Sequence, residues 1–249
     1  MGYLHRTAKN ILQRILLPRQ YELRPISNEY GRGFEGMFRH AKSRGLNPAW
    51  VYDVGVGFGT PWLYDAFPHS KHVWFEPLPM HQASLLPLLK RINATLHPVA
   101  LSKQAGTVRL RVPARSTGSS LRQPTEQWLG LNLNKIRGLS EEVDEIDVPA
   151  VTLDSLHQGG RGVLKMDVEG AEMDVLEGAT KTLADVDLLV MEMSVFPRVI
   201  DEPSFARKIA FLDEVGFELA DIPALNYPLL GASLGYIDAV FTPKASPLW

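Results

Sequence analysis

Short apolar segments alternate with helical ones from about residue 49 onward. The apolar runs are almost continuous, which is typical of strands buried on both faces of a sheet. There are seven, in chain order AWVYDVG, HVWFEP, TLHPVAL, GVLKMDV, DLLVMEMSV, GFELADI and YIDAVFTP. Helical patterns around 61–67, 78–92, 170–184 and 203–215 separate most of them. The alternation predicts an α/β fold with a mostly parallel, Rossmann-like sheet covered by helices on both faces.

Two regions depart from this alternation. Residues 105–150 insert GTVRLRVP, the turn STGSS and a polar helical piece before EIDVPAVTL, which predicts a hairpin and a cap lying over the sheet edge. The last two strands are joined by PALNYPLLGASLG, which has no convincing helical pattern. We therefore expect the last strand to run antiparallel, as in many doubly wound sheets.

The first 48 residues form a basic preface to this fold. Its apolar positions keep a helical period up to Pro18: Leu4, Ala8, Ile11, Leu12, Ile15 and Leu16. Residues 1–50 hold nine Lys or Arg and three Glu, an excess of six positive charges in a chain of net charge −2. We expect a helical extension over 1–48 and a second unit over 49–249. The extension suits contact with an anionic membrane surface, attraction of an anionic acceptor, a lid, or a solvated or dimer-forming arm.

Composition excludes several classes. The 249 residues are 45% hydrophobic and 22% charged, as in soluble globular proteins. Without cysteine there is neither a disulfide framework nor a thiolate nucleophile or metal site. No apolar run reaches the roughly 18–20 residues of a membrane span, and ILQRILLP is too short and too charged for a secretory signal, so we expect a cytoplasmic protein. Basic residues lack interleaved aromatic ones, which argues against nucleic acid as a partner.

A glycine-rich segment, VYDVGVGFGTPW, links the first strand to the first helix. The strand ends in Asp53, and glycines follow at alternate positions: Gly55, Gly57 and Gly59. In an open α/β sheet this crevice binds nucleotide-like ligands. The spacing is not that of G-x-G-x-x-G, because the third glycine would fall at Thr60, and no G-K-[ST] occurs in the chain. An acid before the glycines suits a cationic ligand better than a pyrophosphate.

The pattern D-x-G-x-G-x-G resembles motif I of class I S-adenosylmethionine-dependent methyltransferases. With FEP, HPVAL, GSSL, VPAVTLDSL and above all LKMDVEGAEMDVLEGA, the chain resembles the FkbM family over most of residues 50–195. One departure is Val56-Gly57-Phe58, where many members carry a small residue and Asn after the first glycine. The first 48 residues and the tail beyond 195 match more loosely.

The resemblance implies the seven-stranded class I methyltransferase fold, S-adenosylmethionine as cofactor, and methyl transfer to a hydroxyl of a sugar, glycolipid or natural product. It implies that Asp53 orients the methionine end of the cofactor and that the glycine backbone packs against it. Glu76 would accept hydrogen bonds from the ribose hydroxyls, a match of two oxygens to a diol. Two further cofactor-binding residues, Pro77 and Ala100, stand in FEP and HPVAL.

The resemblance also places the end of the fourth strand beside the transferable methyl, so that Asp167 and Glu169 face the acceptor. We predict Asp167 as the general base, with Glu169 as an acceptor ligand or a partner of the base, since close carboxylates drive each other's pKa apart. Alternatively, Glu169 is an acidic start to a helix, or Asp167, Glu169 and Glu192 bind Mg²⁺. No histidine stands at a persuasive ligand spacing, and we predict no metal.

Three further side chains lie in or near the segments expected to form the site. Lys165 lies inside a buried strand and is expected to pair with a neighbouring acid. His81 and His97 lie near the expected cofactor loops and are assigned no role.

Two other functions compete with methyl transfer: a nicotinamide-dependent oxidoreductase, which the glycine spacing disfavours, and a non-catalytic cofactor-binding protein on the same fold. The expected partner is a small-molecule or glycan acceptor, and a homodimer is compatible with the sequence.

Overall fold

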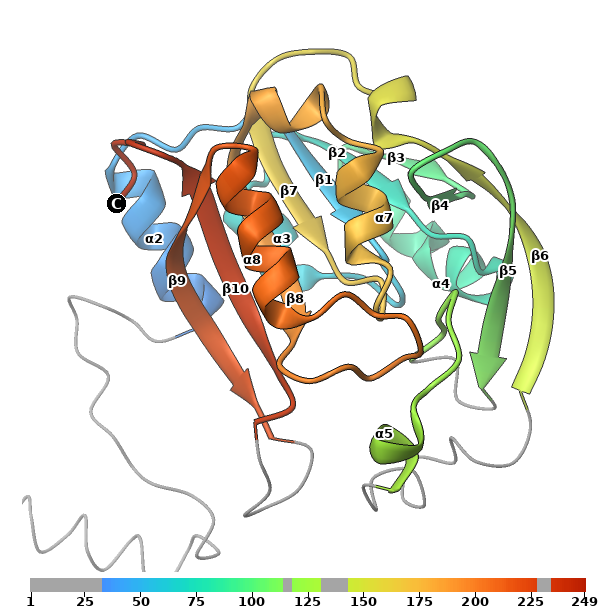
Figure 1. Cartoon of the computed structure of the whole chain (residues 1–249). Helices are drawn as coiled ribbons and strands as arrows, with labels where there is room; N and C mark the ends of the chain where they lie inside the picture. The colour runs from blue at the N-terminus through green and yellow to red at the C-terminus, as the bar shows by residue number, and fades with distance from the viewer. Residues whose placement is uncertain (1–32, 114–117, 131–142, 228–233) are drawn as a thin grey trace, which may run out of the picture.

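The computed structural model describes residues 33–113, 118–130, 143–227 and 234–249. The helix predicted between Leu4 and Pro18 lies outside these ranges. A seven-stranded sheet with the order β3-β2-β1-β7-β8-β10-β9 forms the centre of the molecule (Figure 1). Its strands are β1 (Trp50–Val54), β2 (Lys71–Phe75), β3 (Ala94–His97), β7 (Gly162–Met166), β8 (Val186–Ser194), β9 (Phe217–Asn226) and β10 (Tyr236–Pro243).

The predicted strand directions are confirmed. β1 pairs in parallel with β2 and β7, and the parallel pairing continues to β3 on one side and β8 on the other. β10 lies between β8 and β9 and runs antiparallel to both. Strand order and direction are those of class I methyltransferases, so the carboxyl ends of β1, β2 and β7 meet at one edge of the sheet.

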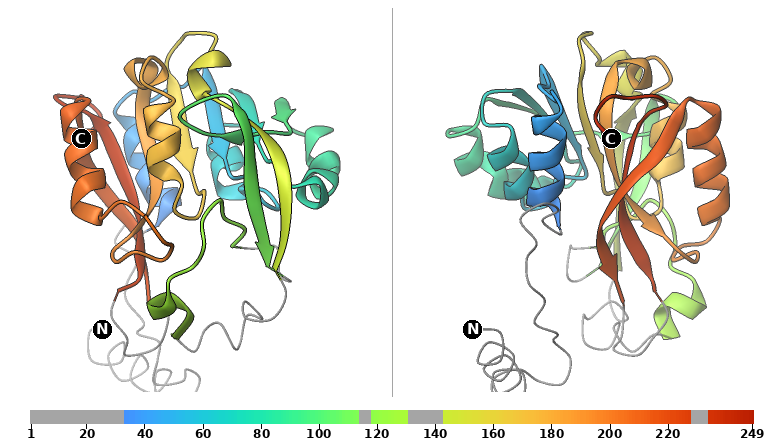
Figure 2. Two further views of the ribbon diagram at one scale, coloured as in Figure 1. Left: turned by 45° about the vertical axis from the view of Figure 1, so that its right-hand side comes forward. Right: turned by 90° about the vertical axis from the view of Figure 1, so that its left-hand side faces the viewer.

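Helices cover both faces of the sheet (Figure 2). They are α2 (Phe34–Ser43), α3 (Pro61–Ala66), α4 (Pro79–Leu89), α7 (Glu172–Glu177) and α8 (Phe205–Glu214), while the short α5 (Glu126–Gly130) lies beyond the edge of the sheet (Figure 2). Val51 of β1 packs into the core shared with α2, α3 and α4, whereas its neighbours Trp50 and Tyr52 face the core beneath α7 and α8. This alternation is the reason that a nearly continuous apolar run predicts a strand buried twice.

Two predicted elements are shorter than the sequence pattern suggested. TLHPVAL is one strand in the prediction, but β3 ends at His97, and β4 (Ala100–Leu101) belongs to a second sheet. Pro98 lies at the break because proline has no N–H to donate to a ladder. The helix predicted over 170–184 ends at Gly178, where a Cβ atom would lie 2.2 Å from the carbonyl oxygen of Ser102, and a 3₁₀ turn (Thr182–Asp185) follows.

The predicted insertion is a hairpin. β5 (Gly106–Pro113) and β6 (Val143–Val151) pair antiparallel, and β4 completes a three-stranded sheet with the order β4-β6-β5. Residues 118–130, which we call the cap segment, lead from the hairpin to the loop after β8. There Thr125 N–H donates to the Arg198 carbonyl and Ile200 N–H to the Gln123 carbonyl. The insertion is thus bonded directly to the edge of the sheet that carries the predicted acids.

The extension ends against the main core. Met37, Phe38 and Ala41 of α2 are at most 2% exposed and pack with the α3 side of the sheet. A domain boundary at residue 48 stays a prediction. None of the described helices is long and apolar enough to cross a membrane.

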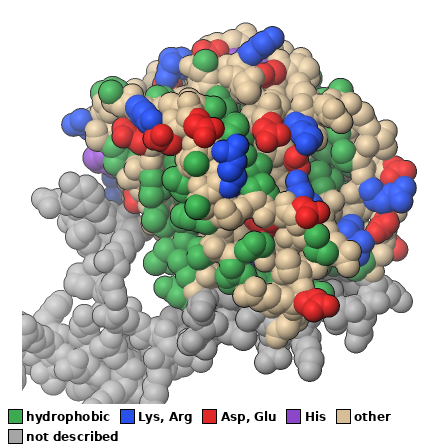
Figure 3. Space-filling view, in the orientation of Figure 1, with side chains coloured by type: hydrophobic (Ala, Val, Ile, Leu, Met, Phe, Trp, Pro, Cys, Tyr) green, Lys and Arg blue, Asp and Glu red, His purple; other side chains and the backbone are tan. Residues whose placement is uncertain are grey.

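The outer strand β9 exposes three large apolar side chains, Leu219, Ile222 and Leu225, and Tyr227 directly after it is exposed as well. Figure 3 shows hydrophobic side chains gathered on the part of the surface that carries β9 and α8 in Figure 1. A homodimer stays a prediction.

Candidate active site

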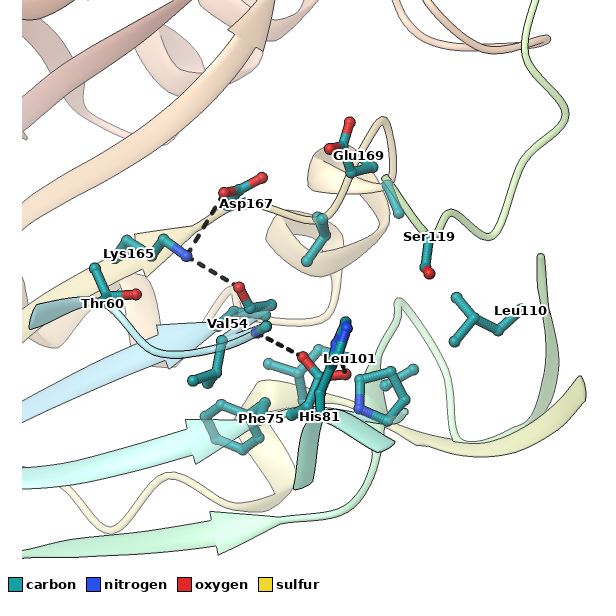
Figure 4. A pocket seen from close by; sticks show the side chains of 18 of the residues that line it. Val54, Thr60, Phe75, His81, Leu101, Leu110, Ser119, Lys165, Asp167 and Glu169 are labelled. Atoms are coloured by element: carbon teal, nitrogen blue, oxygen red, sulfur yellow. Dashed lines mark hydrogen bonds and ion pairs between the residues drawn. The ribbon is translucent and has the colours of Figure 1, made fainter. Parts of the chain in front are cut away.

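A cavity of about 400 Å³ opens where β1, β2 and β7 end (Figure 4). The glycine loop, the end of β2, the β4 region, the cap segment and the loop after β7 line it. Of the residues predicted to bind cofactor, six line this cavity: Gly55, Gly57, Gly59, Glu76, Pro77 and Ala100. The predicted catalytic residues Asp167 and Glu169 line it as well. Asp53 does not.

The three glycines have different physical roles. All have positive φ, between 57° and 108°, where side chains are strained. A Cβ atom on Gly55 would lie 1.9 Å from the carbonyl oxygen of Asp167, and one on Gly59 would lie 2.9 Å from Leu88 Cδ1. A Cβ atom on Gly57 would meet nothing within 4 Å. Gly55 is therefore required by packing against backbone, Gly59 is favoured by its positive φ, and Gly57 is the position where an absent side chain leaves room for a ligand.

Glu76 is fixed by backbone donors. Its carboxylate, on a residue 4% exposed, accepts one hydrogen bond from Gly57 N–H at Oε2 and one from Leu78 N–H at Oε1, both 2.8 Å. Each oxygen keeps further acceptor capacity for a ligand hydroxyl. His81 lies behind Glu76, with Nδ1 3.4 Å from Oε1, and the exposed ring of Phe58 packs on it with centroids 4.6 Å apart. Spacing arguments did not predict this aromatic wall.

Asp53 reaches the cavity only through Lys165. It is fully buried, and its carboxylate accepts a hydrogen bond from Tyr64 OH at 2.7 Å. Lys165 Nζ lies 3.1 Å from Asp53 Oδ1 and 3.1 Å from the Gly55 carbonyl oxygen. It also lies 3.9 Å from Asp167 Oδ2 (Figure 4). The predicted pairing of Lys165 with a neighbouring acid is confirmed. Burial alone would lower the pKa of Lys165, but Asp53 and Asp167 hold that pKa above its ordinary value.

Three carboxylates gather beyond Lys165. Asp167, Glu169 and Glu192 each place an oxygen within 4.8 Å of the others. The guanidinium of Arg198 lies against two of them, 3.2 Å from Glu169 Oε2 and 2.7 Å from Glu192 Oε1, and Nε donates to Ser194 Oγ at 2.7 Å. Arg198 therefore already provides a cation at these carboxylates, and a divalent ion would compete with it.

Sequence reasoning missed Arg198, although a single arginine in the apolar segment SVFPRVI was a signal. It is 4% exposed and lies against the rings of Trp128 and Tyr236, at 5.7 and 4.7 Å. An arginine is rarely buried without a partner. A search for acids near the end of β8 would have paired it with Glu192.

Two carboxyl groups of the cluster and one beside it have pKa values above their ordinary range. Burial, together with Asp167 and against the opposing effect of Arg198, raises the pKa of Glu169 to about 7. Burial and Asp167 likewise raise the pKa of Glu192 well above its ordinary value. The pKa of the neighbouring Asp238 rises to about 6 through burial, although Asn226 donates to its carboxylate. Such perturbed groups are characteristic of sites that move protons.

Glu169 is not the start of a helix. Its backbone has φ 49°, in the left-handed region, and α7 begins three residues later at Glu172. Non-glycine residues in this region cost free energy and persist where the surroundings hold them. Ser120 Oγ, from the cap segment, donates to the Glu169 carbonyl at 2.7 Å.

Two smaller cavities meet the first at these acids. One, of about 230 Å³, shares Lys165 and Asp167 with it and is lined by Phe34, Trp62, Glu192, Asn226, Tyr236 and Asp238. The other, of about 130 Å³, shares Glu169 and is lined by Trp128, Arg198 and Tyr236 among others. Phe34 stacks on Trp62 with ring centroids 3.9 Å apart, so α2 forms part of this wall. A ligand in the glycine cavity and a second one beside it would meet at Asp167 and Glu169.

A large cavity at a glycine loop and a carboxylate cluster at the adjacent strand end define a methyltransferase-type site on this fold. The family model described as the methyltransferase FkbM domain matches residues 53–219, about two thirds of the chain. The chain belongs to this family of methyltransferases.

A solved structure of a member of this family has the same fold. Methyltransferase FkbM from Methylobacillus flagellatus KT superposes with a TM-score of 0.53 at 14% identity, over 85% of this chain and 48% of that chain. The chain thus spans about half the length of that protein. Precorrin-6y C5,15-methyltransferase from Geobacter metallireducens GS-15 gives 0.41 at 12% identity, over 91% and 95% of the two chains. Magnesium protoporphyrin IX methyltransferase from Synechocystis PCC 6803, with bound SAM, gives 0.43 at 11%, over 98% and 94%. No curated protein matches.

Proposed function

We propose that this chain is an S-adenosylmethionine-dependent O-methyltransferase in which Asp167 removes the proton from an acceptor hydroxyl. One observation carries the proposal. Asp167 lines both the glycine cavity and the 230 Å³ cavity beside it, so its carboxylate stands between the two ligands that the reaction must bring together.

The residues of the glycine cavity fit the cofactor. Gly57 leaves space at the backbone, Glu76 offers oxygens to a diol, and Pro77 and Ala100 form apolar walls. Asp53 would act at one remove by holding Lys165, whose remaining donor capacity suits the carboxylate of the methionine end. When bound, the cofactor contributes an electrophilic methyl group, and the chain has chiefly to align the attacking oxygen with it.

The acceptor that these cavities suit is a hydroxyl compound such as a sugar, a glycolipid or a natural product. The 230 Å³ cavity combines aromatic rings with acceptors of O–H hydrogen bonds, Glu192, Asn226 and Asp238. A hydroxyl is a weak nucleophile unless a base removes its proton during attack, which contributes about 10²–10⁴-fold to the rate. A carboxylate at Asp167, flanked by Glu169, supplies this base.

Two neighbouring functions are less well supported. A nicotinamide enzyme would need a different glycine spacing and does not follow from the family. A non-catalytic protein would not need a cluster of three carboxylates, two of them with raised pKa values (Glu169 and Glu192), where the cavities meet. The proposal also includes contact of the basic extension with an anionic membrane surface, which sedimentation with anionic vesicles tests. It includes residence in the cytoplasm, which cell fractionation tests.

The test combines binding with turnover. Calorimetry with S-adenosylhomocysteine and with NAD decides the cofactor, and binding of NAD alone would refute the proposal. A panel of glycosides, glycolipids and hydroxylated metabolites is then incubated with labelled donor, and products are identified by mass. Methylated hydroxyl products support the proposal, whereas methylation confined to nitrogen or carbon would contradict it.

A further inference from the structure

Three buried charged side chains lie behind Glu169 and Arg198, away from every cavity described above. Lys208 of α8 is 0% exposed, and its Nζ lies 3.1 Å from Glu172 Oε2 and 2.6 Å from Glu202 Oε1. We call these three residues the buried triad. α8 and α7, which carry two of them, lie side by side on one face of the sheet (Figures 1 and 2).

Each acid of the buried triad also accepts hydrogen bonds from a loop of the active site. Glu172 Oε1 accepts from Gly170 N–H at 2.9 Å, next to Glu169. Glu202 Oε2 accepts from Arg198 N–H at 2.7 Å. Because Arg198 in turn pairs with Glu169 at 3.2 Å, the contacts form a closed ring that joins the loops after β7 and β8.

The ring is tight at its centre. A Cβ atom on Gly170, which has φ 94°, would lie 2.4 Å from Val199 Cγ2, so the two loops touch there. The neighbouring Glu169 has the left-handed backbone that only firm surroundings maintain. The hydrogen bond from Gly170 to Glu172 restrains the chain at this point.

The carboxylate of Glu202 keeps its charge in the interior. Burial would raise the pKa of Glu202, yet Lys208 and the hydrogen bonds to its carboxylate hold that pKa below its ordinary value. Apolar side chains of similar volume often serve stability as well as buried ion pairs do. What they would not provide is an acceptor for both Gly170 N–H and Arg198 N–H.

We propose that Glu172, Lys208 and Glu202 are positioning residues that set the separation and orientation of Glu169 and Arg198. The inference rests on the proposed function for its kinetic consequence and on geometry alone for its structural one. The second glutamate of the EGAE segment thus acts on the first, through the loop between them.

The principal test is the triple variant Glu172→Met, Glu202→Met and Lys208→Met, which removes both the charges and the carboxylate acceptors of the buried triad. Lys244→Met is the matched control, since Lys244 pairs with Asp213 at 2.7 Å on the surface. We expect kcat of the triple variant to fall roughly 10²-fold through misplacement of the site. The affinity for S-adenosylhomocysteine should stay within about threefold, because the glycine cavity is untouched, and Lys244→Met should match the wild type.

A merely structural role is separated by repeating the triple substitution in an Arg198→Gln background. If the buried triad acts through Arg198 and Glu169, it has little left to position there, and kcat should change less than about threefold. The inference would be overturned if the triple substitution lowered kcat by a further 10²-fold in the Arg198→Gln background. It would also be overturned if the triple substitution left kcat of the otherwise wild-type protein unchanged. If the triple variant does not fold, Glu172→Met alone undergoes the same comparison.

A crystal structure of the variant tests the geometry without turnover. We expect the closest distance between Glu169 and Arg198 to exceed 4 Å, and an unchanged ion pair would overturn the inference. If the wild type methylates no hydroxyl, the proposed function fails, while this distance still decides the positioning role.

Discussion

The two halves of the site are built by different means. On the glycine side, Gly57 and Glu76 follow the ends of β1 and β2, and Gly57 N–H donates a hydrogen bond to the Glu76 carboxylate. On the acid side, Glu169, Glu192 and Arg198 come from separate loops and strands and are joined through charge. The glycine side is therefore held together by local contacts, and the acid side is an assembly whose parts depend on one another.

The largest effect is expected from Asp167→Asn. Loss of the base should lower kcat about 10²–10⁴-fold. The affinity for S-adenosylhomocysteine should change less than about threefold, since the amide is of similar size. Rapid-quench assays and calorimetry measure the two quantities. Asp213→Asn, which alters an exposed acid of α8, is the control, and equal losses in both variants would remove Asp167 from the reaction.

Glu76→Gln tests the cofactor half. The amide presents an NH₂ group to one of two backbone N–H donors, so a buried donor loses its partner, at a cost of about 1–3 kcal/mol. We expect the affinity for S-adenosylhomocysteine to fall about 10–100-fold, with kcat at saturating donor much less affected. Calorimetry against the wild type provides the measurement. Unchanged affinity would mean that Glu76 faces no ligand.

Substitutions of two glycines separate an effect on packing from an effect on cofactor binding. Gly55→Ala should destabilise the fold by several kcal/mol, because its Cβ would overlap the Asp167 carbonyl. Gly57→Ala should cost only about 1–2 kcal/mol for its positive φ but should also weaken S-adenosylhomocysteine binding.

The matched control for both is Gly45→Ala, which has φ 105° and no atom within 4 Å of its Cβ, far from the cavity. It should show the stability cost alone. Urea unfolding and calorimetry measure these quantities, and Gly57→Ala with normal affinity would contradict the role of Gly57.

The smallest effect concerns pH. Because the pKa of Glu169 is raised to about 7, above its value in the unfolded chain, the folded state binds the extra proton between about pH 4.5 and 7. Stability from this group is fully present below that window and is lost as pH rises through it. We expect the Tm of Glu169→Gln to decline less than that of the wild type from pH 5 to 7.5. Parallel declines would show that Glu169 titrates normally.

Local signals were sufficient for the fold and for the glycine side. Periodicity predicted all seven strands, the lack of a helix before the last strand predicted its antiparallel direction, and Pro98 explains the one strand that is divided. The positions of Gly55, Gly57 and Glu76 at the cavity follow from strand ends that meet at one sheet edge.

The acid side was only half predictable. Lys165 was expected to pair with an acid, and it pairs with Asp53. The Asp53 carboxylate points to Lys165 and not into the cavity because Tyr64, eleven residues further on, donates a hydrogen bond to it. Arg198 and Lys208 find their partners across loops whose contacts exist only in the folded chain. Ion pairs between residues far apart in the chain produce no regular spacing in the sequence. The pairing on the acid side therefore required the structure.

The most direct test is a crystal structure of the protein with S-adenosylhomocysteine. We predict the ribose hydroxyls within hydrogen-bond distance of Glu76, the chain of the ligand along Gly57, and its sulfur on the side of Asp167. A ligand bound elsewhere, or one whose sulfur points away from Asp167 and Glu169, would contradict the account.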